Sequence, residues 1–454
     1  MSQSTPKRSL APRDLKLIDR SLKTANAEVA ARCPGERSDR QPVHTVYGGA
    51  HLFRSDTART LANGALAAME TFAPDPEALA RALGLDRATG AAIYPRVIEK
   101  LRREAVEDFR IDFEDGYGHR PDAEEDGHAQ SVAAELARGF AAGTLPAFIG
   151  IRLKPLSKEL HARSLRTLDL FVTTLSAQAG RRLPPNFIVT IPKLMSPAHV
   201  EAVARACTAL ERRLRLPKNA IRLELMIETP QSIIAIDGTS ALRALIDAGG
   251  GRVTGAHFGT YDYTALCGIT ASWQRMRHSV CDFAKHMMQV SLAQTGVHLS
   301  DGATAVMPIA PHRASASHVL TDIELAENRE AVHRAWKVHF DDVTHSLVNG
   351  FYQGWDLHPA QLPTRYAALF AFFHASRPAA TARLRNFVDK AAQATRIGDV
   401  FDDAATGQGL LNFFARGVSS GAISTDEARE TGLSLDEIQG RSFLKILEAR
   451  RHKS

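Results

Sequence analysis

The stretch FRIDFEDGYGHRPDAEEDG, residues 109–127, shows the unit from which the fold is expected to be built. Apolar and polar side chains alternate over residues 109–113, which is typical of a buried strand. Three carboxylates lie around the end of that strand: Asp112, Glu114 and Asp115. Two glycines then mark a sharp turn, and the acidic AEED run at 123–126 is typical of the first turn of a helix. The stretch therefore predicts a strand, a turn and a helix, with carboxylates gathered where the strand ends.

A short apolar run followed by a helical pattern recurs along the chain. Eight runs have strand character: VHTVY (43–47), FRIDF (109–113), AFIGIR (147–152), FIVTI (187–191), IRLELMI (221–227), RVTGAHF (252–258), AVMPI (305–309) and GWDLH (354–358). Helical stretches lie between them, as at 196–214, where Ser196 is expected to cap the helix and Pro197 to begin it. Eight such units predict an α/β fold, a closed (β/α)8 TIM barrel. An open doubly wound sheet is the alternative, and no GxGxxG pattern follows the first run to support it.

Two parts of the chain fall outside the eight units. Residues 1–40 are expected to form an N-terminal helical extension with a linker. Residues 379–454 are expected to form a C-terminal helical region that ends in a basic tail, LEARRHKS. The barrel is assigned to residues 41–378. Its second unit is long, and residues 57–108 are expected to hold two or three helices before the second strand.

The composition narrows the class of protein. Hydrophobic residues make up 44% of the chain and charged residues 23%, which is ordinary for a globular protein. No apolar run approaches the roughly 18 residues of a membrane helix, so no membrane partner is expected. The four cysteines are scattered without a CxxC pair, which favours free thiols and a cytoplasmic location. The net charge of +6 is mild and dispersed, which indicates small anionic substrates rather than nucleic acid.

The C-terminal ends of the strands form the active site in a barrel of this kind. The charged side chains expected there are Asp112, Glu114, Asp115, Arg152, Lys154, Lys193, Glu228, Asp262 and His358. Glu228 and Asp262 follow neighbouring strands, and two carboxylates together with substrate oxygens suit Mg²⁺. Such a cation would supply positive charge near Glu114 and Asp115, which otherwise repel each other. Arg152 could then hold a substrate carboxylate or enolate oxygen through its guanidinium fork.

Six short motifs occur in chain order, about one for each expected strand. They are DFEDG (112–116), IRLK (151–154), IPK (191–193), MIETP (226–230), FGTYDYTA (258–265) and LHPAQ (357–361). With them the chain resembles the citrate lyase β-subunit and HpcH/HpaI aldolase superfamily, over roughly residues 43–365. The resemblance implies a Mg²⁺-dependent barrel of the phosphoenolpyruvate/pyruvate type. It also implies a homo-oligomer, since members are commonly trimers or hexamers, and the added helices make this chain look like an enlarged, divergent member.

The resemblance also implies roles for individual residues. Glu228 and Asp262 would hold Mg²⁺ or Mn²⁺, and Arg152 would bind the keto or enolate oxygen and the carboxylate of the substrate. Glu114 and Asp115 would order waters around the metal. Each of these residues has a structural alternative as well. Glu228 could serve at a helix start, Asp262 could cap the next helix, and Arg152 could pair with Glu114 or Asp115. Glu114 and Asp115 could, with Asp112, form a turn that points to solvent.

Two further residues are expected to contact the substrate. Lys193 follows the fourth strand, and His358 lies in the H-P-x-Q motif near the entrance of the barrel. Lys193 could instead cap a carbonyl at the surface, and His358 could be a structural histidine. The HpcH branch uses a histidine as a base where this chain has Asp115, so the general acid or base stays open among Asp115, His358, a water on the metal and a group from a neighbouring subunit.

The expected activity is that of a Mg²⁺-dependent carbon–carbon lyase or aldolase. Its substrate would be a 2-keto acid or acyl-CoA-type molecule that reacts through a metal-stabilised enolate. Coenzyme A could form part of the substrate, although the sequence contains no nucleotide fingerprint. The alternatives are a malate-synthase-like condensing enzyme, a phosphoenolpyruvate-using enzyme, and a catalytically silent barrel that acts as a binding protein.

Overall fold

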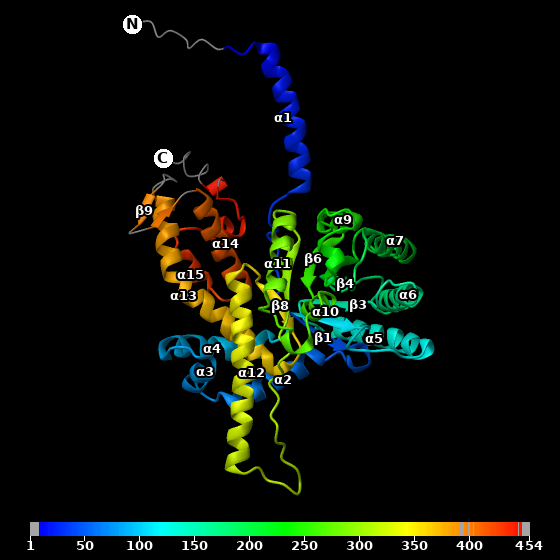
Figure 1. The fold of residues 1–454 in the computed structure, drawn as a ribbon, viewed down its shortest axis with the longest axis vertical. Helices are drawn as coiled ribbons and strands as arrows, with labels where there is room; N and C mark the ends of the chain where they lie inside the picture. Colours follow the sequence, from blue (N-terminus) through cyan, green and yellow to red (C-terminus); the bar gives the residue numbers. More distant parts are fainter. Residues whose placement is uncertain (1–8, 390–394, 398–399, 403, 444, 447–454) are drawn as a thin grey trace.

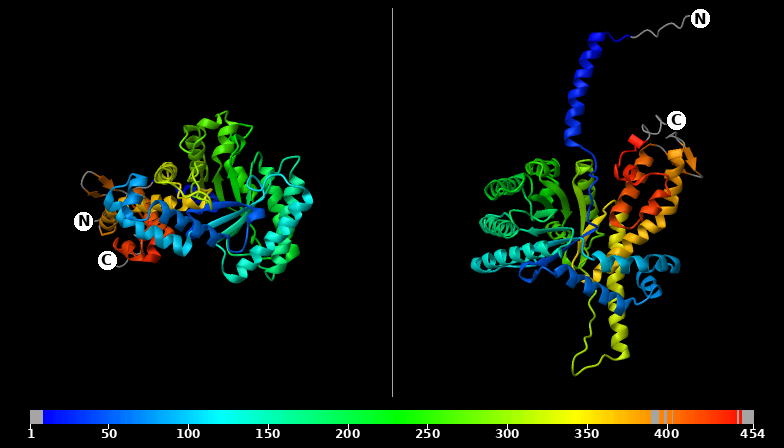
Figure 2. Two further views of the ribbon diagram at one scale, coloured as in Figure 1. Left: turned by 90° about the horizontal axis from the view of Figure 1, so that it is seen from below. Right: turned by 180° about the vertical axis from the view of Figure 1, so that it is seen from behind.

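The computed structural model describes residues 9–389, 395–397, 400–402, 404–443 and 445–446. Eight parallel strands form a closed barrel in chain order, surrounded by helices (Figures 1 and 2). The strands are β1 (His44–Gly49), β2 (Asp108–Asp112), β3 (Phe148–Arg152), β4 (Phe187–Ile191), β5 (Arg222–Ile227), β6 (Val253–Phe258), β7 (His298–Ala303) and β8 (Gln353–Asp356). The pairing of β1 with β8, with Thr45 opposite Trp355, closes the barrel. The predicted (β/α)8 barrel is therefore confirmed.

Helices connect successive strands and cover the outside of the barrel. Three helices precede β2, in agreement with the prediction for residues 57–108: α2 (Thr57–Phe72), α3 (Pro76–Leu83) and α4 (Arg87–Glu104). The later connections hold α5 (Asp122–Ala142), α6 (His161–Gln178), α7 (Pro197–Leu214), α8 (Pro230–Ile233), α9 (Leu242–Ala248), α10 (Thr260–Leu266), α11 (Ser279–Leu292) and α12 (Asp322–Val348). As predicted, Pro197 begins α7, and the Ser196 hydroxyl accepts a hydrogen bond from the Ala198 amide at 3.3 Å.

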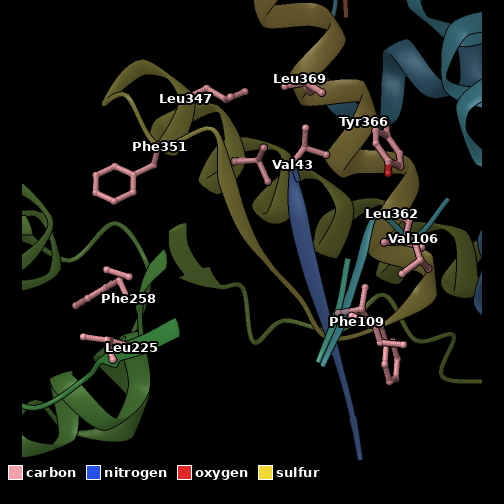
Figure 3. Close-up of a cluster of buried hydrophobic side chains, with 14 of the residues drawn as sticks. Val43, Val106, Phe109, Leu225, Phe258, Leu347, Phe351, Leu362, Tyr366 and Leu369 are labelled. Atoms are coloured by element: carbon pink, nitrogen blue, oxygen red, sulfur yellow. The ribbon is translucent and has the colours of Figure 1, made fainter. Parts of the chain in front are cut away.

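The apolar core lies between the strands and the helices, whereas the inside of the barrel carries charged side chains. Figure 3 shows part of this core, in which Phe109 lies near Val106 and Leu362. The next residue along β2, Arg110, points the opposite way. Its Nε donates to the Thr190 hydroxyl at 3.0 Å and its Nη2 to Glu224 at 3.2 Å, on β4 and β5. Burial of the helix-facing side chains therefore holds the barrel closed and leaves its interior to polar groups.

The seventh strand does not lie where the sequence predicted it. The AVMPI run at 305–309 belongs to the long loop before α12, and its large apolar side chains are 36–49% exposed. The strand is instead the polar segment His298–Ala303. Its Asp301 is buried, lies 3.0 Å from the Lys285 ammonium and accepts a hydrogen bond from the Ser346 hydroxyl at 2.6 Å. The prediction was wrong because polar pairing, rather than an apolar run, holds this strand in the sheet.

Helical segments extend the barrel at both ends of the chain. α1 (Pro12–Arg32) has no buried residue and projects from the end of the barrel at which the strands begin (Figures 1 and 2). The C-terminal elements are α13 (Leu362–Asp389), the hairpin of β9 (Thr395–Ile397) and β10 (Val400–Asp402), α14 (Ala404–Ser420), α15 (Thr425–Arg429) and α16 (Leu435–Gln439). α13 packs against α4 and runs through residue 378, so the division of the chain into 1–40, 41–378 and 379–454 stays a prediction. The basic tail at 447–454 lies outside the described residues.

No helix within the described ranges combines the length and the apolar character needed to cross a membrane.

Candidate active site

Asp112 fixes the shape of the loop that follows β2. Its carboxylate accepts hydrogen bonds from the Glu114 amide at 2.9 Å and from the Gly116 amide at 2.7 Å. A Cβ atom on Gly116 would lie 2.7 Å from Oδ2 of Asp112, so a larger residue would displace the carboxylate. From the end of β3, the Lys154 ammonium donates to the Phe113 carbonyl at 2.8 Å. The loop is therefore held from both sides at the C-terminal end of the barrel.

Arg152, the last residue of β3, is 2% exposed and is held by Asp112. Its Nε and Nη2 donate to the two carboxylate oxygens at 2.8 and 2.5 Å. The guanidinium also lies over the rings of Tyr47 and Trp355, 4.9 and 5.4 Å from their centroids. Nη1 lies 2.9 Å from Oε2 of Glu114, but the two atoms are not aligned for a hydrogen bond. Nη1 also lies 3.5 Å from Oδ2 of Asp115, so the alternative that Arg152 pairs with Glu114 or Asp115 is confirmed. Among the described residues Nη1 has these ion pairs but no hydrogen-bond partner, so a ligand oxygen could still accept a hydrogen bond from it.

Lys193 places its ammonium among three carboxylates. Its Nζ pairs with Oε1 of Glu114 and lies 3.4 Å from Asp115 and 3.5 Å from Asp262. The backbone of Lys193 has a φ of +48°, which L residues adopt infrequently, and its amide donates to Oε1 of Glu228 at 2.7 Å. The structure therefore joins four of the predicted site residues, from the ends of three strands, around one lysine from the end of a fourth strand.

Glu228 follows β5 and is 1% exposed. The hydroxyl of Thr229, and not Glu228, caps α8, so the capping alternative does not apply to Glu228. A Cβ atom on Gly259 would lie 2.5 Å from Cβ of Glu228, which shows that the missing side chain makes room for this carboxylate. Asp262 lies in the first turn of α10, beyond Gly259 at its N-cap, and its side chain is 38% exposed. Of the two predicted metal ligands, Glu228 is therefore buried and Asp262 is open to solvent.

The negative charge of the cluster exceeds the positive charge around it. Burial raises the pKa of Glu228 to about 8, and the charges of Glu114 and Asp262 contribute. Burial also raises the pKa of Glu114 to about 7, against the opposing charges of Arg152 and Lys193. Both buried carboxyl groups therefore lose their protons much nearer to neutral pH than exposed glutamates do.

This arrangement fits a divalent cation. Within the described ranges, no three His, Cys, Asp or Glu side chains are grouped as a complete metal site by themselves. Mg²⁺ needs only one or two protein carboxylates, because water and substrate oxygens complete its coordination. Oε2 of Glu114 is buried without a hydrogen-bond partner among the described residues, although it lies 2.9 Å from Nη1 of Arg152. Burial, together with the charges of Glu114 and Asp262, raises the pKa of Glu228 despite the nearby charges of Lys193 and Arg152, so a further positive charge at this place would favour the carboxylate. Glu228 and Asp262 are the residues that could hold such an ion.

His358 is not joined to this cluster in the part of the chain that the structure describes. It caps the short 3-10 helix η3 (Pro359–Gln361), where its Nδ1 accepts a hydrogen bond from the Ala360 amide at 3.1 Å. Its substrate-binding role stays a prediction, as do the roles of the other named residues.

Sequence reasoning missed the groups that surround Arg152. The sequence predicts Asp112 at the end of a strand but gives it no role in the site. It indicates Tyr47 and Trp355 only as members of predicted strands. His257 of β6 also lies among these groups. Its imidazole is buried beside both rings, with centroid distances of 5.9 and 5.3 Å, and neither ring nitrogen has a hydrogen-bond partner among the described residues. The inward side of alternating strand positions was the available signal for these aromatic residues.

Solved structures with a similar fold share little sequence with this chain. A citrate lyase from Burkholderia xenovorans LB400 aligns at 18% identity with a TM-score of 0.56, over 86% of this chain and 96% of that one. The protein CitE from Mycobacterium tuberculosis, in complex with magnesium, acetoacetate and coenzyme A, aligns at 14% with a TM-score of 0.47, over 85% and 99%. A malate synthase from Haloferax volcanii, as a lead(II) complex, aligns at 13% with a TM-score of 0.45, over 92% and 99%. The likeness to the Burkholderia structure shows the fold alone.

Sequence comparison places the chain in a family. Curated protein sequences give no match. The family model described as Domain of unknown function (DUF6986) matches residues 22–446, which is most of the chain. The chain therefore belongs to the DUF6986 family.

Proposed function

We propose that this protein is a divalent-cation-dependent carbon–carbon lyase or aldolase. Its substrate would be a 2-keto acid or an acyl-CoA-type molecule, and the reaction would pass through an enolate. The observation that carries the proposal is the convergence of Glu114, Glu228 and Asp262 on Lys193, beside Nη1 of Arg152, which makes ion pairs but no hydrogen bond among the described residues. This combination offers a cation site, a donor for a substrate oxygen and a protonated carboxyl group in one place.

Glu228 and Asp262 would hold Mg²⁺ or Mn²⁺. The cation would supply Lewis-acid polarisation of the substrate carbonyl and stabilise negative charge as it develops. Arg152 would contribute Nη1 to the same substrate oxygen or to the carboxylate. The orientation of the guanidinium is fixed before substrate arrives, because Nε and Nη2 donate hydrogen bonds to the Asp112 carboxylate. A hydrogen-bond donor that is already oriented stabilises the transition state more strongly.

Glu114 is the group best suited to hold and move a proton. Burial raises its pKa to about 7, and a catalytic acid or base works best with a pKa near the working pH. Its Oε2 has no hydrogen-bond partner among the described residues, whereas Oε1 pairs with Lys193. We therefore assign proton transfer to Oε2 of Glu114, with Asp115 as the more exposed neighbour that raises the pKa of Glu114 by its charge.

The remaining expectations belong to this proposal. A small anionic substrate suits the positive charges of Arg152 and Lys193, and His358 would line the entrance. The proposal also includes three expectations from the sequence: a homo-oligomeric state, a cytoplasmic location and the use of coenzyme A.

A thermal-shift titration tests the cation site. The native protein is heated with Mg²⁺ or Mn²⁺, with oxalate as a mimic of the pyruvate enolate, and with both. Binding at a hundredfold excess over Kd stabilises the folded state by about 2.7 kcal/mol, which corresponds to about 3 °C for a chain of this size. We expect a shift that needs metal and oxalate together, that is lost in Glu228→Gln, and that is kept in the matched control Glu201→Gln on the exposed face of α7. No shift, or an equal shift in Glu228→Gln, would overturn the proposal.

A further inference from the structure

A second cavity lies at the opposite end of the barrel from the candidate active site. It has a volume of about 720 Å³ and lies where the strands begin, between the end of α1, the linker after it, and the segments around β5, β6 and β7. Figure 1 shows that α1 leaves the barrel at this end, while the loop before α12 leaves it at the other. We call it the basal cavity. Its volume is within the range of small-molecule pockets, about 300–1,000 Å³.

The walls of the basal cavity are strongly basic. Six basic side chains line it: Arg32, Arg37, Lys218, Arg222, Arg243 and Arg252. The acidic residue that lines it is Asp247, which pairs with Arg32 at 3.4 Å. Carboxylates pair with three of the six positive charges, namely Asp247 with Arg32, Glu211 with Arg252 and Asp39 with Arg37, so three positive charges are left over and favour anions.

Three of these basic residues are free to bind a ligand. Arg252 forms an ion pair with Glu211, and Arg37 forms one with Asp39 at 2.5 Å. By contrast, no residue in the described part of the chain forms an ion pair with Lys218, Arg222 or Arg243; Nη2 of Arg243 donates only to a backbone carbonyl, at 3.1 Å. Unpaired like charges that face one hollow repel each other, and an anion between them would relieve this repulsion.

A separate observation points to the same cavity. Thr254 of β6 lines it, and its hydroxyl is buried without a hydrogen-bond partner among the described residues. Buried polar atoms in proteins are almost always paired. Thr254 lines both the basal cavity and a small cavity beside it, so its hydroxyl lies next to the basal cavity and lacks a partner in the part of the chain that the structure describes. A hydroxyl can donate to a phosphate oxygen, as the three free cations can.

We infer that the basal cavity binds a small molecule that carries several phosphate groups. Arginine guanidinium groups match the geometry of phosphate oxygens, and three separate free cations suit a chain of phosphates better than a single one. Ile246, Val253 and Val297 also line the cavity, which gives room for an apolar moiety beside the phosphates. This ligand site is independent of the proposed reaction, because it lies at the other end of the barrel.

Isothermal titration calorimetry with tripolyphosphate and with ATP, in EDTA at low salt, tests the inference. The variant that removes the three free charges is Lys218→Gln/Arg222→Gln/Arg243→Gln. The control removes the same charge from helix positions outside the cavity: Arg59→Gln/Arg102→Gln/Arg138→Gln. Hydrogen bonds to charged groups contribute enough that the cavity variant should bind at least about tenfold more weakly, while the control should stay within about twofold of the native protein.

The outcomes separate clearly. Tighter binding of ATP would identify an organic phosphate as the source of the ligand, and equal binding would identify the phosphate chain alone; both support the inference. Absence of saturable binding would overturn it, and so would an equal loss in the control. A loss in Glu228→Gln would assign the phosphate to the candidate active site instead and would also overturn it. Lys218→Gln alone, at an exposed position, should still weaken binding severalfold if the triple variant fails to fold.

Discussion

Replacement of Glu228 by glutamine is expected to stabilise the metal-free protein near neutral pH. Glu228 is 1% exposed, and burial raises the pKa of its carboxyl group to about 8, with the charges of Glu114 and Asp262 adding to the effect. The folded protein therefore keeps a proton that the unfolded chain, with an ordinary pKa of 4.5, has released by pH 7. Glutamine cannot ionise, and its Oε1 can still accept the hydrogen bond from the Lys193 amide that Glu228 accepts at 2.7 Å.

The size and sign of the effect follow from the raised pKa of Glu228. Stability from the held proton is fully present below about pH 4.5 and is lost as the pH rises toward about 8. The interval between the unfolded-state pKa of 4.5 and pH 7 is about 2.5 pH units, and each unit corresponds to about 1.36 kcal/mol. Over this interval the free energy of unfolding of the native protein therefore falls by about 3 kcal/mol, whereas that of Glu228→Gln does not. A chain of this length changes its Tm by about 1 °C per kcal/mol, so the variant should melt about 3 °C higher at pH 7.

Differential scanning fluorimetry of EDTA-treated protein between pH 4.5 and pH 8 measures this difference. The Tm values of the native protein and Glu228→Gln should agree within about 1 °C at pH 4.5 and separate as the pH rises. Glu201→Gln, which changes an exposed glutamate on α7, should follow the native protein throughout. Equal Tm values at pH 7, or a gain of the same size at pH 4.5, would refute the reasoning, because neither fits a buried carboxyl group that ionises late.

Three further changes test other contacts of the site. Asp112→Asn should leave the charge of Arg152 buried and poorly paired, and calorimetry should show a loss of about 3–5 kcal/mol in the free energy of unfolding; a neutral effect would contradict the assigned contact. Gly259→Ala should abolish the metal-dependent thermal shift, because the added Cβ atom would lie 2.5 Å from Cβ of Glu228 although the φ of −107° suits alanine; an unchanged shift would count against Glu228 as a ligand. Lys193→Met should remove a charge that lowers the pKa of Glu228, so the pH midpoint of Mn²⁺ binding, followed by calorimetry, should move upward; a downward move would contradict this.

Most of the fold could be predicted because the strands follow a simple physical pattern. Strands buried under helices need apolar and β-branched residues, and seven of the eight predicted runs overlap the observed strands. The seventh strand lacks that pattern, since the pairing of Asp301 with Lys285 and Ser346 stabilises it instead. Partners of this kind lie far apart in the sequence, and no local pattern reveals them.

The candidate site could be predicted in its location but not in its contacts. The C-terminal ends of barrel strands meet at one face, and this rule predicts that Glu114, Arg152, Lys193 and Glu228 lie close together. The structure shows these contacts. The sequence did not indicate that Asp112 would occupy one edge of the Arg152 guanidinium. That contact depends on rotamers and on the register between β2 and β3, which places the two residues opposite each other.

Deuterium exchange into the carbon next to the carbonyl group, followed by NMR in D₂O, tests the central claim most directly. This carbon is the methyl group of pyruvate or acetyl-CoA and the C3 methylene of 2-oxobutyrate. Exchange at this carbon reports formation of the enolate without requiring knowledge of the second substrate, and exchange with acetyl-CoA alone would favour a condensing enzyme over a keto-acid lyase. We expect exchange of at least one of the three that needs Mg²⁺ or Mn²⁺ and falls by at least about a hundredfold in Glu228→Gln, since one transition-state contact is worth about 2.7 kcal/mol or more. Exchange with none of them, or exchange that is equally fast in Glu228→Gln, would contradict an enolate site built on the strand-end carboxylates.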